Sequence, residues 1–204
     1  MPRSSDELKA NYQISVGEPE RILARETVAI TLSPHDALRY ASRFWVDTES
    51  GLLLKAALLN GGEILEQVGF SQLQIMPMAD MEWFRPNAEQ HKTYEVKPEE
   101  QVLASGEDNR WVVGQLPPGF RKVKQVMRTL PGRQQPVRHM VFCDGLASVS
   151  LFIEPVGRHH PRGGTLVQGA TNVVSKTIAD YQVVVLGEVP SATLQQIVNS
   201  VTAK

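Results

Sequence analysis

The alternation of apolar and polar side chains in the first third of the chain constrains its fold most. Between positions 22 and 32 the even positions are mainly apolar and the odd positions mainly polar. Successive side chains of a β-strand point to opposite faces, so this period of two predicts strands with one buried face. Asn60-Gly61-Gly62 is typical of a hairpin turn between two such runs. We therefore predict an antiparallel meander of about five strands over residues 12–75.

The last hundred residues combine strand patterns with one helix. Asp144-Gly145 stands between two apolar runs, which predicts a hairpin. After Pro190 the apolar residues recur at positions 194, 197, 198 and 201, the spacing of one helix face. The predicted fold class is mostly β (α+β): an antiparallel meander is followed by a small antiparallel sheet with a C-terminal helix.

The region between the two modules is acidic and contains breaks in regular structure. Pro77, Pro86 and Pro98 lie there, and proline interrupts both helices and central strands. We interpret residues 1–76 as a first domain, 77–106 as a linker and 107–204 as a second domain. One helical turn is expected around residues 80–84.

Charge is balanced over the whole chain but uneven along it. The 21 basic and 22 acidic residues give a net charge of −1, which argues against a generally basic nucleic-acid-binding protein. Residues 105–204 nevertheless hold eleven basic and six acidic residues. Complementary docking against the acidic first domain, or chance, explains this excess, and an acidic partner for the second domain is the functional alternative.

The basic residues of the second domain gather in two places, one predicted strand and one glycine-rich loop. They are candidates for contact with phosphate or carboxylate groups. A plain solvated surface is the alternative for all of them. The candidate binding residues are Arg121, Lys122, Lys124, Arg128, Arg158 and Arg162.

No catalytic, metal-binding or cofactor-binding residues are predicted. Cys143 and His139 would lie about 13–14 Å apart on one strand, too far for a nucleophile and its base. His159-His160 is flanked by arginines, which repel a metal cation. The sequence also contains no P-loop, dinucleotide or G-x-S-x-G motif, so we expect a protein that is not an enzyme.

Several stretches of the second domain resemble the MucB/RseB family of sigma-E regulatory proteins. They are residues 111–120 (WVVGQLPPGF), 142–154 (FCDGLASVSLFIE), 169–175 (GATNVVS), 180–183 (DYQV) and 187–190 (GEVP). In the first domain, residues 39–40, 44–47 and 51–55 look like the last strands of the family's large domain. The resemblance implies a fold similar to the carriers LolA and LolB, a curved half-open sheet with an apolar cavity.

The resemblance also implies a function. Family members bind the periplasmic part of a membrane anti-sigma factor of the RseA/MucA type and shield it from proteolysis. The chain would then be a periplasmic negative regulator of the envelope stress response, released by lipopolysaccharide or another lipid. The alternative from a different class is a periplasmic lipid or lipoprotein carrier of the LolA/LolB type.

Two further expectations follow from the first domain. The resemblance begins late in the large domain and no signal-peptide core follows Met1, so we expect this sequence to be part of a longer protein. A meander alone leaves an open edge and an uncovered apolar face. We therefore expect a homo-oligomer formed through the first domain.

Overall fold

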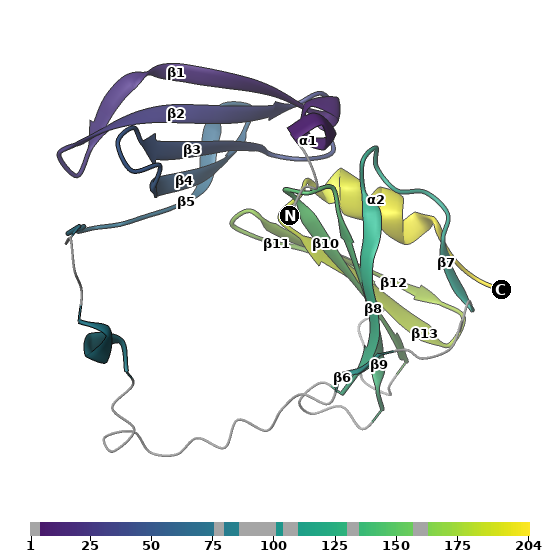
Figure 1. Ribbon diagram of the computed structural model, residues 1–204. Coiled ribbons are helices and arrows are strands. Elements are labelled where there is room, and N and C mark those ends of the chain that lie inside the picture. Colours follow the sequence, from purple (N-terminus) through teal and green to yellow (C-terminus); the bar gives the residue numbers. More distant parts are fainter. Residues whose placement is uncertain (1–4, 76–79, 86–100, 104–109, 130–134, 157–162) are drawn as a thin grey trace.

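The computed structural model describes residues 5–75, 80–85, 101–103, 110–129, 135–156 and 163–204. It contains one antiparallel sheet of five strands, a second of seven strands and a small two-stranded sheet (Figure 1). The two large sheets meet close to the first helix, Ser5–Asn11 (Figure 1). This arrangement confirms the predicted α+β class, in which antiparallel strands dominate.

The first sheet is a meander in which every strand pairs with its neighbours in sequence. The helix α1 (Ser5–Asn11) leads into β1 (Tyr12–Ile22), β2 (Arg25–Pro34), β3 (Ala41–Asp47), β4 (Leu53–Asn60) and β5 (Glu63–Gly69). The predicted hairpin joins β4 to β5. Gly61 and Gly62 have φ angles of 57° and 91°, and a two-residue type I′ turn needs positive φ at both positions.

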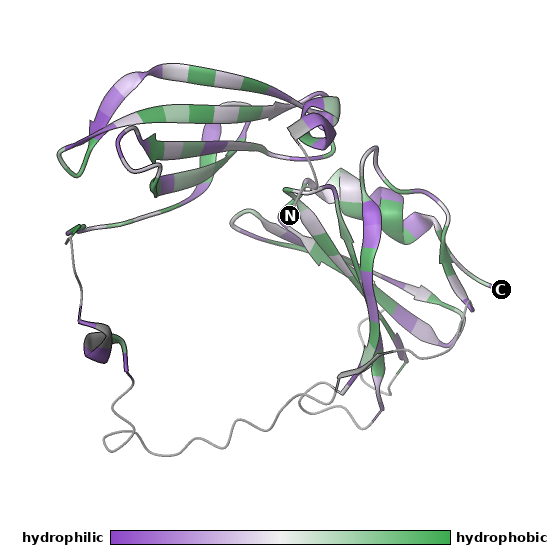
Figure 2. Ribbon diagram, viewed as in Figure 1, coloured by the Kyte–Doolittle hydropathy of each residue, from purple (hydrophilic) through white to green (hydrophobic). Residues whose placement is uncertain are grey.

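One row of side chains on a face of this sheet is apolar from edge to edge. Residues that are partners across antiparallel strands point to the same face. Successive pairings connect Val16, Ile30, Phe44, Ala56 and Val68, which we call the apolar row. Its outermost members, Val16 and Val68, are 67% and 71% exposed. Figure 2 shows the corresponding alternation of hydrophobic and hydrophilic bands along the strands.

The second sheet is less regular in its connections. Its strand order is β11-β12-β13-β10-β9-β8-β6, so β13 lies between β12 and β10. The strands are β6 (Gln101–Leu103), β8 (Arg121–Arg128), β9 (Val137–Cys143), β10 (Ser148–Pro155), β11 (Gly164–Gln168), β12 (Thr171–Ile178) and β13 (Tyr181–Gly187). The predicted Asp144-Gly145 hairpin connects β9 to β10.

The helix α2 (Ser191–Asn199) packs on one face of the second sheet and closes the main core (Figure 1). It begins after Pro190, and the predicted stripe of Leu194, Ile197 and Val198 is buried. These side chains pack with buried residues of the central strands, including Leu151 and Val185. The first sheet has a much smaller core, which consists of Trp45, Ala57 and Leu59.

Some elements were not predicted. Neither a helix at α1 nor a strand at β11 was predicted, and the last residues were expected to be helical. The structure instead adds β14 (Val201–Ala203) after α2, paired with β7 (Trp111–Val113). The short helix η1 (Met81–Phe84) confirms the expected helical turn, and Asp80 caps it by accepting from Glu82 N–H. β6 lies within the range that we interpreted as linker.

Truncation of the main core should destabilise the protein far more than truncation of its surface. Leu151 is fully buried, so Leu151→Ala is expected to lower the free energy of unfolding by about 2–5 kcal/mol. Leu166, at 63% exposure on β11, is the matched control, and Leu166→Ala should change stability by less than about 0.5 kcal/mol. Urea denaturation of both variants measures the difference. Equal losses would contradict the assignment of the core.

Candidate functional site

A buried carboxylate joins the two large sheets. Asp144 belongs to the β9–β10 turn, and its side chain is completely buried. One carboxylate oxygen accepts from Tyr12 Oη at 2.8 Å and from Arg39 Nη1 at 2.5 Å. The other accepts from the main-chain N–H groups of Leu146 and Ala147 at 2.9 and 2.8 Å. The turn of the second sheet is therefore fixed to the first strand and the β2–β3 loop of the first.

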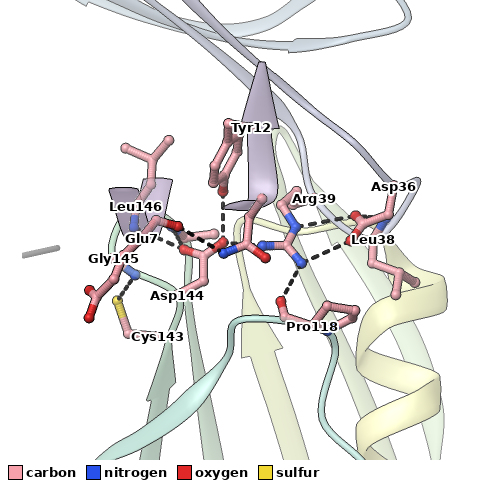
Figure 3. Close-up of polar contacts among 12 residues, drawn as sticks. Glu7, Tyr12, Asp36, Leu38, Arg39, Pro118, Cys143, Asp144, Gly145 and Leu146 are labelled. Carbon is pink, nitrogen blue, oxygen red and sulfur yellow. Dashed lines mark hydrogen bonds and ion pairs between the residues drawn. The ribbon is translucent and has the colours of Figure 1, made fainter. Parts of the chain in front are cut away.

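Arg39 completes this junction. Its guanidinium also donates to Asp36 at 2.9 Å and to the main-chain oxygen of Pro118 at 2.7 Å. The guanidinium carbon lies 5.1 Å from the ring centre of Phe120 and 5.5 Å from that of Tyr12. Figure 3 shows Tyr12 and Arg39 converging on Asp144 from the first sheet. A buried arginine needs such partners, because an unpaired buried charge is costly.

The electrostatics of the junction keep its groups in one protonation state. Burial raises the pKa of Tyr12 well above its usual value, and the neighbouring negative charge of Asp144 adds to this effect. Tyr12 therefore remains a hydrogen-bond donor to Asp144. Burial acts to lower the pKa of Arg39, but hydrogen bonding to Asp36 and the charge of Asp144 raise it overall. Arg39 thus stays charged.

A second set of polar contacts ties the β2–β3 loop to the start of α2. Thr193 Oγ1 donates to the main-chain oxygen of Leu38 at 2.6 Å. Asn172 Nδ2 donates to Tyr40 Oη at 3.0 Å, and Asn172 Oδ1 accepts from Ser191 Oγ at 2.8 Å. The residue spacing of these contacts, up to 155 positions, explains why no local sequence pattern pointed to them.

A cavity of about 590 Å³ lies beside this junction, between the two sheets. Tyr12 and Tyr40 line it near the junction. The first sheet contributes Phe44, Ala56, Leu58, Glu66, Gln67 and Val68. The second contributes Leu146, Ser148, Ser150, Thr171, Leu186 and Glu188. This volume and mixed lining are typical of a binding site for a small molecule or an inserted side chain.

The side chains that line the cavity include acidic groups. Glu66 and Glu188 line it, and none of the described lining side chains is a lysine, arginine or histidine. Three members of the apolar row, Phe44, Ala56 and Val68, also face it. The cavity therefore continues into the exposed apolar face of the first sheet, and its own wall favours apolar or cationic groups over anionic ones.

A serine–histidine pair occurs near the cavity, but its hydrogen bonds do not suit catalysis. His139 Nε2 lies 3.1 Å from Ser150 Oγ, and Arg128 Nη1 lies 3.4 Å from His139 Nδ1. Arginine can only donate, so Nδ1 accepts and the proton of a neutral ring is on Nε2. Burial and the nearby charges of Arg128 and Lys124 lower the pKa of His139. The ring then donates to Ser150 and cannot remove its proton.

A bulge divides the basic residues of β8 between the two faces of the second sheet. The register shifts at Val123, so Lys122 lies opposite Phe142 and Lys124 lies opposite Val141. Phe142 is part of the core under α2, whereas Val141 pairs with a residue that lines the cavity. Lys122 is therefore on the α2 side, where its Nζ donates to an amide oxygen at 2.7 Å. Lys124 is on the cavity side.

Arg121 and Arg128 also lie on the cavity side, as judged from their strand partners. Arg121 forms an ion pair of 3.6 Å with Glu7 of α1. Three of the predicted binding residues thus share one face, although none of them lines the cavity itself. Arg158 and Arg162 lie outside the described residues, as do His159 and His160.

The described residues contain neither a candidate metal site nor a candidate membrane-spanning helix. No cluster of three or more histidine, cysteine, aspartate or glutamate side chains in the described ranges has the arrangement to hold a metal ion. None of the helices in the described part of the chain has the length and apolar character needed to span a membrane.

Neutralising the buried carboxylate should break the junction. Asp144→Asn leaves Asp36 as the remaining carboxylate partner of Arg39 and turns an amide NH2 toward groups that donate, so we expect a loss of about 1.5–3 kcal/mol in the free energy of unfolding. Asp180→Asn, at an exposed position of the β12–β13 turn, is the matched control and should lose less than about 0.5 kcal/mol. Chemical denaturation measures both. An Asp144→Asn protein as stable as its control would show that the buried pair does not hold the sheets together.

Comparisons with known proteins agree with this architecture. The family model for the MucB/RseB N-terminal domain matches residues 1–88, and that for the C-terminal domain matches residues 105–202. The chain is 31% identical to the sigma factor AlgU regulatory protein MucB of Pseudomonas aeruginosa, over 96% of this chain and 62% of that protein. It is 25% identical to the sigma-E factor regulatory protein RseB of Haemophilus influenzae, over 96% of this chain and 61% of that protein. The chain thus spans about three-fifths of the length of these relatives.

Solved structures extend the agreement to three dimensions. The complex of Pseudomonas aeruginosa MucA and MucB matches with a TM-score of 0.80 and 30% identity, over 98% of this chain and 68% of that chain. A crystal structure of MucB in complex with MucA(peri) also gives a TM-score of 0.80, over 99% of this chain and 71% of that chain. Both confirm the resemblance that the sequence motifs indicated. The chain belongs to the MucB/RseB family of sigma factor regulatory proteins.

Proposed function

We propose that this chain binds the periplasmic segment of a membrane anti-sigma factor of the RseA/MucA type. The observation that carries the proposal is the cavity between the two sheets, which opens onto the apolar row. An apolar cavity wall with a few polar groups suits the side chains of an inserted peptide. The solved complexes of MucB with MucA support the same kind of partner.

The consequence of such binding is negative regulation of the sigma factor. A segment held between two sheets is less accessible to a protease, because cleavage requires an extended and exposed backbone. Shielding would keep the anti-sigma factor intact and the envelope-stress sigma factor inactive. The chain would then act in the periplasm, where the segment lies.

A charge placed at the cavity end of the apolar row should weaken this binding. Val68 lines the cavity and Val16 does not, yet they lie on the same sheet face with similar exposure. We expect Val68→Glu to raise the dissociation constant for the periplasmic segment at least tenfold, because the new carboxylate must be desolvated. Val16→Glu, the matched control, should change it less than twofold. Isothermal titration calorimetry with the cognate segment measures both.

The same titration tests the proposal as a whole. The parent chain should bind the segment and slow its cleavage by an added protease in the same concentration range. Absence of binding at tens of micromolar would contradict the proposal. Equal weakening by both glutamate variants would instead place the partner on the whole sheet face and not at the cavity.

We also propose that an anionic lipid, such as lipopolysaccharide, is the signal that competes with the anti-sigma segment for this chain. The lipid would contact the basic residues of the cavity-side face. Arg121, Lys124 and Arg128 lie on that face, whereas the wall of the cavity is acidic. Phosphate groups would therefore bind the sheet surface beyond the cavity, through charge-assisted hydrogen bonds.

The bulge at Val123 offers a matched pair of variants for this idea. Lys124→Glu on the cavity side should weaken binding to lipopolysaccharide micelles about two- to fivefold, since an exposed ion pair contributes only about 0–1 kcal/mol. Lys122→Glu on the α2 side should leave it unchanged. The difference should shrink at high salt, because exposed charges are screened over about 8–10 Å at physiological ionic strength. Equal effects of the two variants would indicate non-specific charge attraction.

A lipid or lipoprotein carrier is the second candidate, favoured by the exposed apolar row. Mass spectrometry of lipid that copurifies with the chain distinguishes the two functions. A stoichiometric neutral lipid, together with no affinity for the anti-sigma segment, would favour the carrier.

A further inference from the structure

The strand β5 forms an open edge of the first sheet. Among the described strands it pairs only with β4, so its outer side has no strand partner. Six of its seven residues are exposed. Exposed edges invite pairing with another chain, and proteins commonly protect them with prolines, bulges or charges. β1, at the other edge, carries Pro19 and a register shift between Val16 and Pro19. β5 contains no proline, and its own register shift at Leu65 and its charges at Glu63 and Glu66 lie on the hairpin side of Gln67, so the part from Gln67 to Gly69 carries none of these features.

The hydrogen-bond pattern shows which main-chain groups of β5 face outward. Phe70 N–H donates to the main-chain oxygen of Leu54 at 3.1 Å. Along an antiparallel strand the N–H and C=O groups of alternate residues point to the same side. Val68, the partner of Ala56, therefore points its main-chain groups toward β4. Those of Gln67 and Gly69 point away from the sheet.

This open edge runs directly into the cavity. Glu66, Gln67 and Val68 all line it. On the facing side, a side chain added at Gly169 would lie 3.9 Å from Glu66 Oε2, so the β11–β12 turn closely approaches β5. A peptide entering the cavity would thus pass along the outward main-chain groups of β5.

We infer that a segment of the anti-sigma partner binds in extended form as a sixth strand on β5, paired to the main chain of Gln67 and Gly69. This inference rests on the proposed function. Main-chain pairing supplies affinity in such strand additions, and side chains at alternate positions supply specificity. An apolar side chain beside Val68 would continue the apolar row into the cavity. A basic side chain beside Glu66 would match the acidic wall.

One substitution separates strand addition from other modes of binding. Gln67→Pro removes an outward N–H that β4 does not use, and proline is accepted on edge strands where its nitrogen faces solvent. We expect it to raise the dissociation constant for the periplasmic segment of the cognate anti-sigma factor at least tenfold. Gln67→Val also loses the amide side chain but keeps the N–H, so it should bind at least about fivefold more tightly than Gln67→Pro. Equal affinities of the two variants would overturn strand addition.

Hydrogen exchange followed by NMR gives an independent readout on the parent chain, even if Gln67→Pro does not fold. Saturation with the segment should slow exchange of the Gln67 and Gly69 amides at least tenfold, while the Val68 amide, already paired with β4, changes little. Unchanged exchange at both outward amides would overturn the inference. Protection that grows with protein concentration in the absence of the segment would assign the edge to a second copy of this chain and overturn it as well.

The outcomes separate the two proposals. A parent chain that does not bind the segment refutes the proposed function and the strand addition that rests on it. A parent chain that binds, with unprotected amides and an unaffected Gln67→Pro variant, refutes strand addition alone.

Discussion

The ion pair between Arg39 and Asp144 is the contact on which the arrangement of the two sheets depends. Both side chains are completely buried, and one carboxylate holds a strand start, a loop and a turn together. Removal of Arg39 leaves the carboxylate of Asp144 buried without a counter-charge, and removal of Asp144 leaves Arg39 with Asp36 as its carboxylate partner on the same sheet. Such a contact tolerates little change in geometry, so it fixes the position of one sheet against the other more strictly than apolar contacts alone would.

The shape of the cavity depends on this contact. Tyr12 donates to Asp144 and lines the cavity, and the turn residues Leu146 and Ala147 both bond the same carboxylate and line the opposite wall. The side chain of Asp144 thus holds both walls of the cavity, one from each sheet, in position. A binding site at a domain junction is flexible unless the junction is well determined, and here polar contacts determine it.

The sequence predicted local features well and distant ones poorly. Alternation of side chains, the Asp144-Gly145 turn and the helix after Pro190 depend on neighbours in the chain, and all three were recognised. The role of Arg39 was missed because its partner lies 105 residues away. Lys122 and Lys124 looked like one patch, yet an inserted residue at Val123 turned them to opposite faces. A bulge leaves no periodic signal in a strand of eight residues.

The position of β13 inside the second sheet has a consequence for the order in which the sheets form during synthesis. The meander can form while the chain is still emerging, because each of its strands pairs with the one before. The second sheet must wait for Tyr181–Gly187, which joins β10 to β12, and Leu186 of that strand completes the cavity wall. Contacts between distant segments form slowly. A nascent chain would therefore expose the apolar row before the second wall of the cavity exists, and the cavity is complete only after Glu188 has been synthesised.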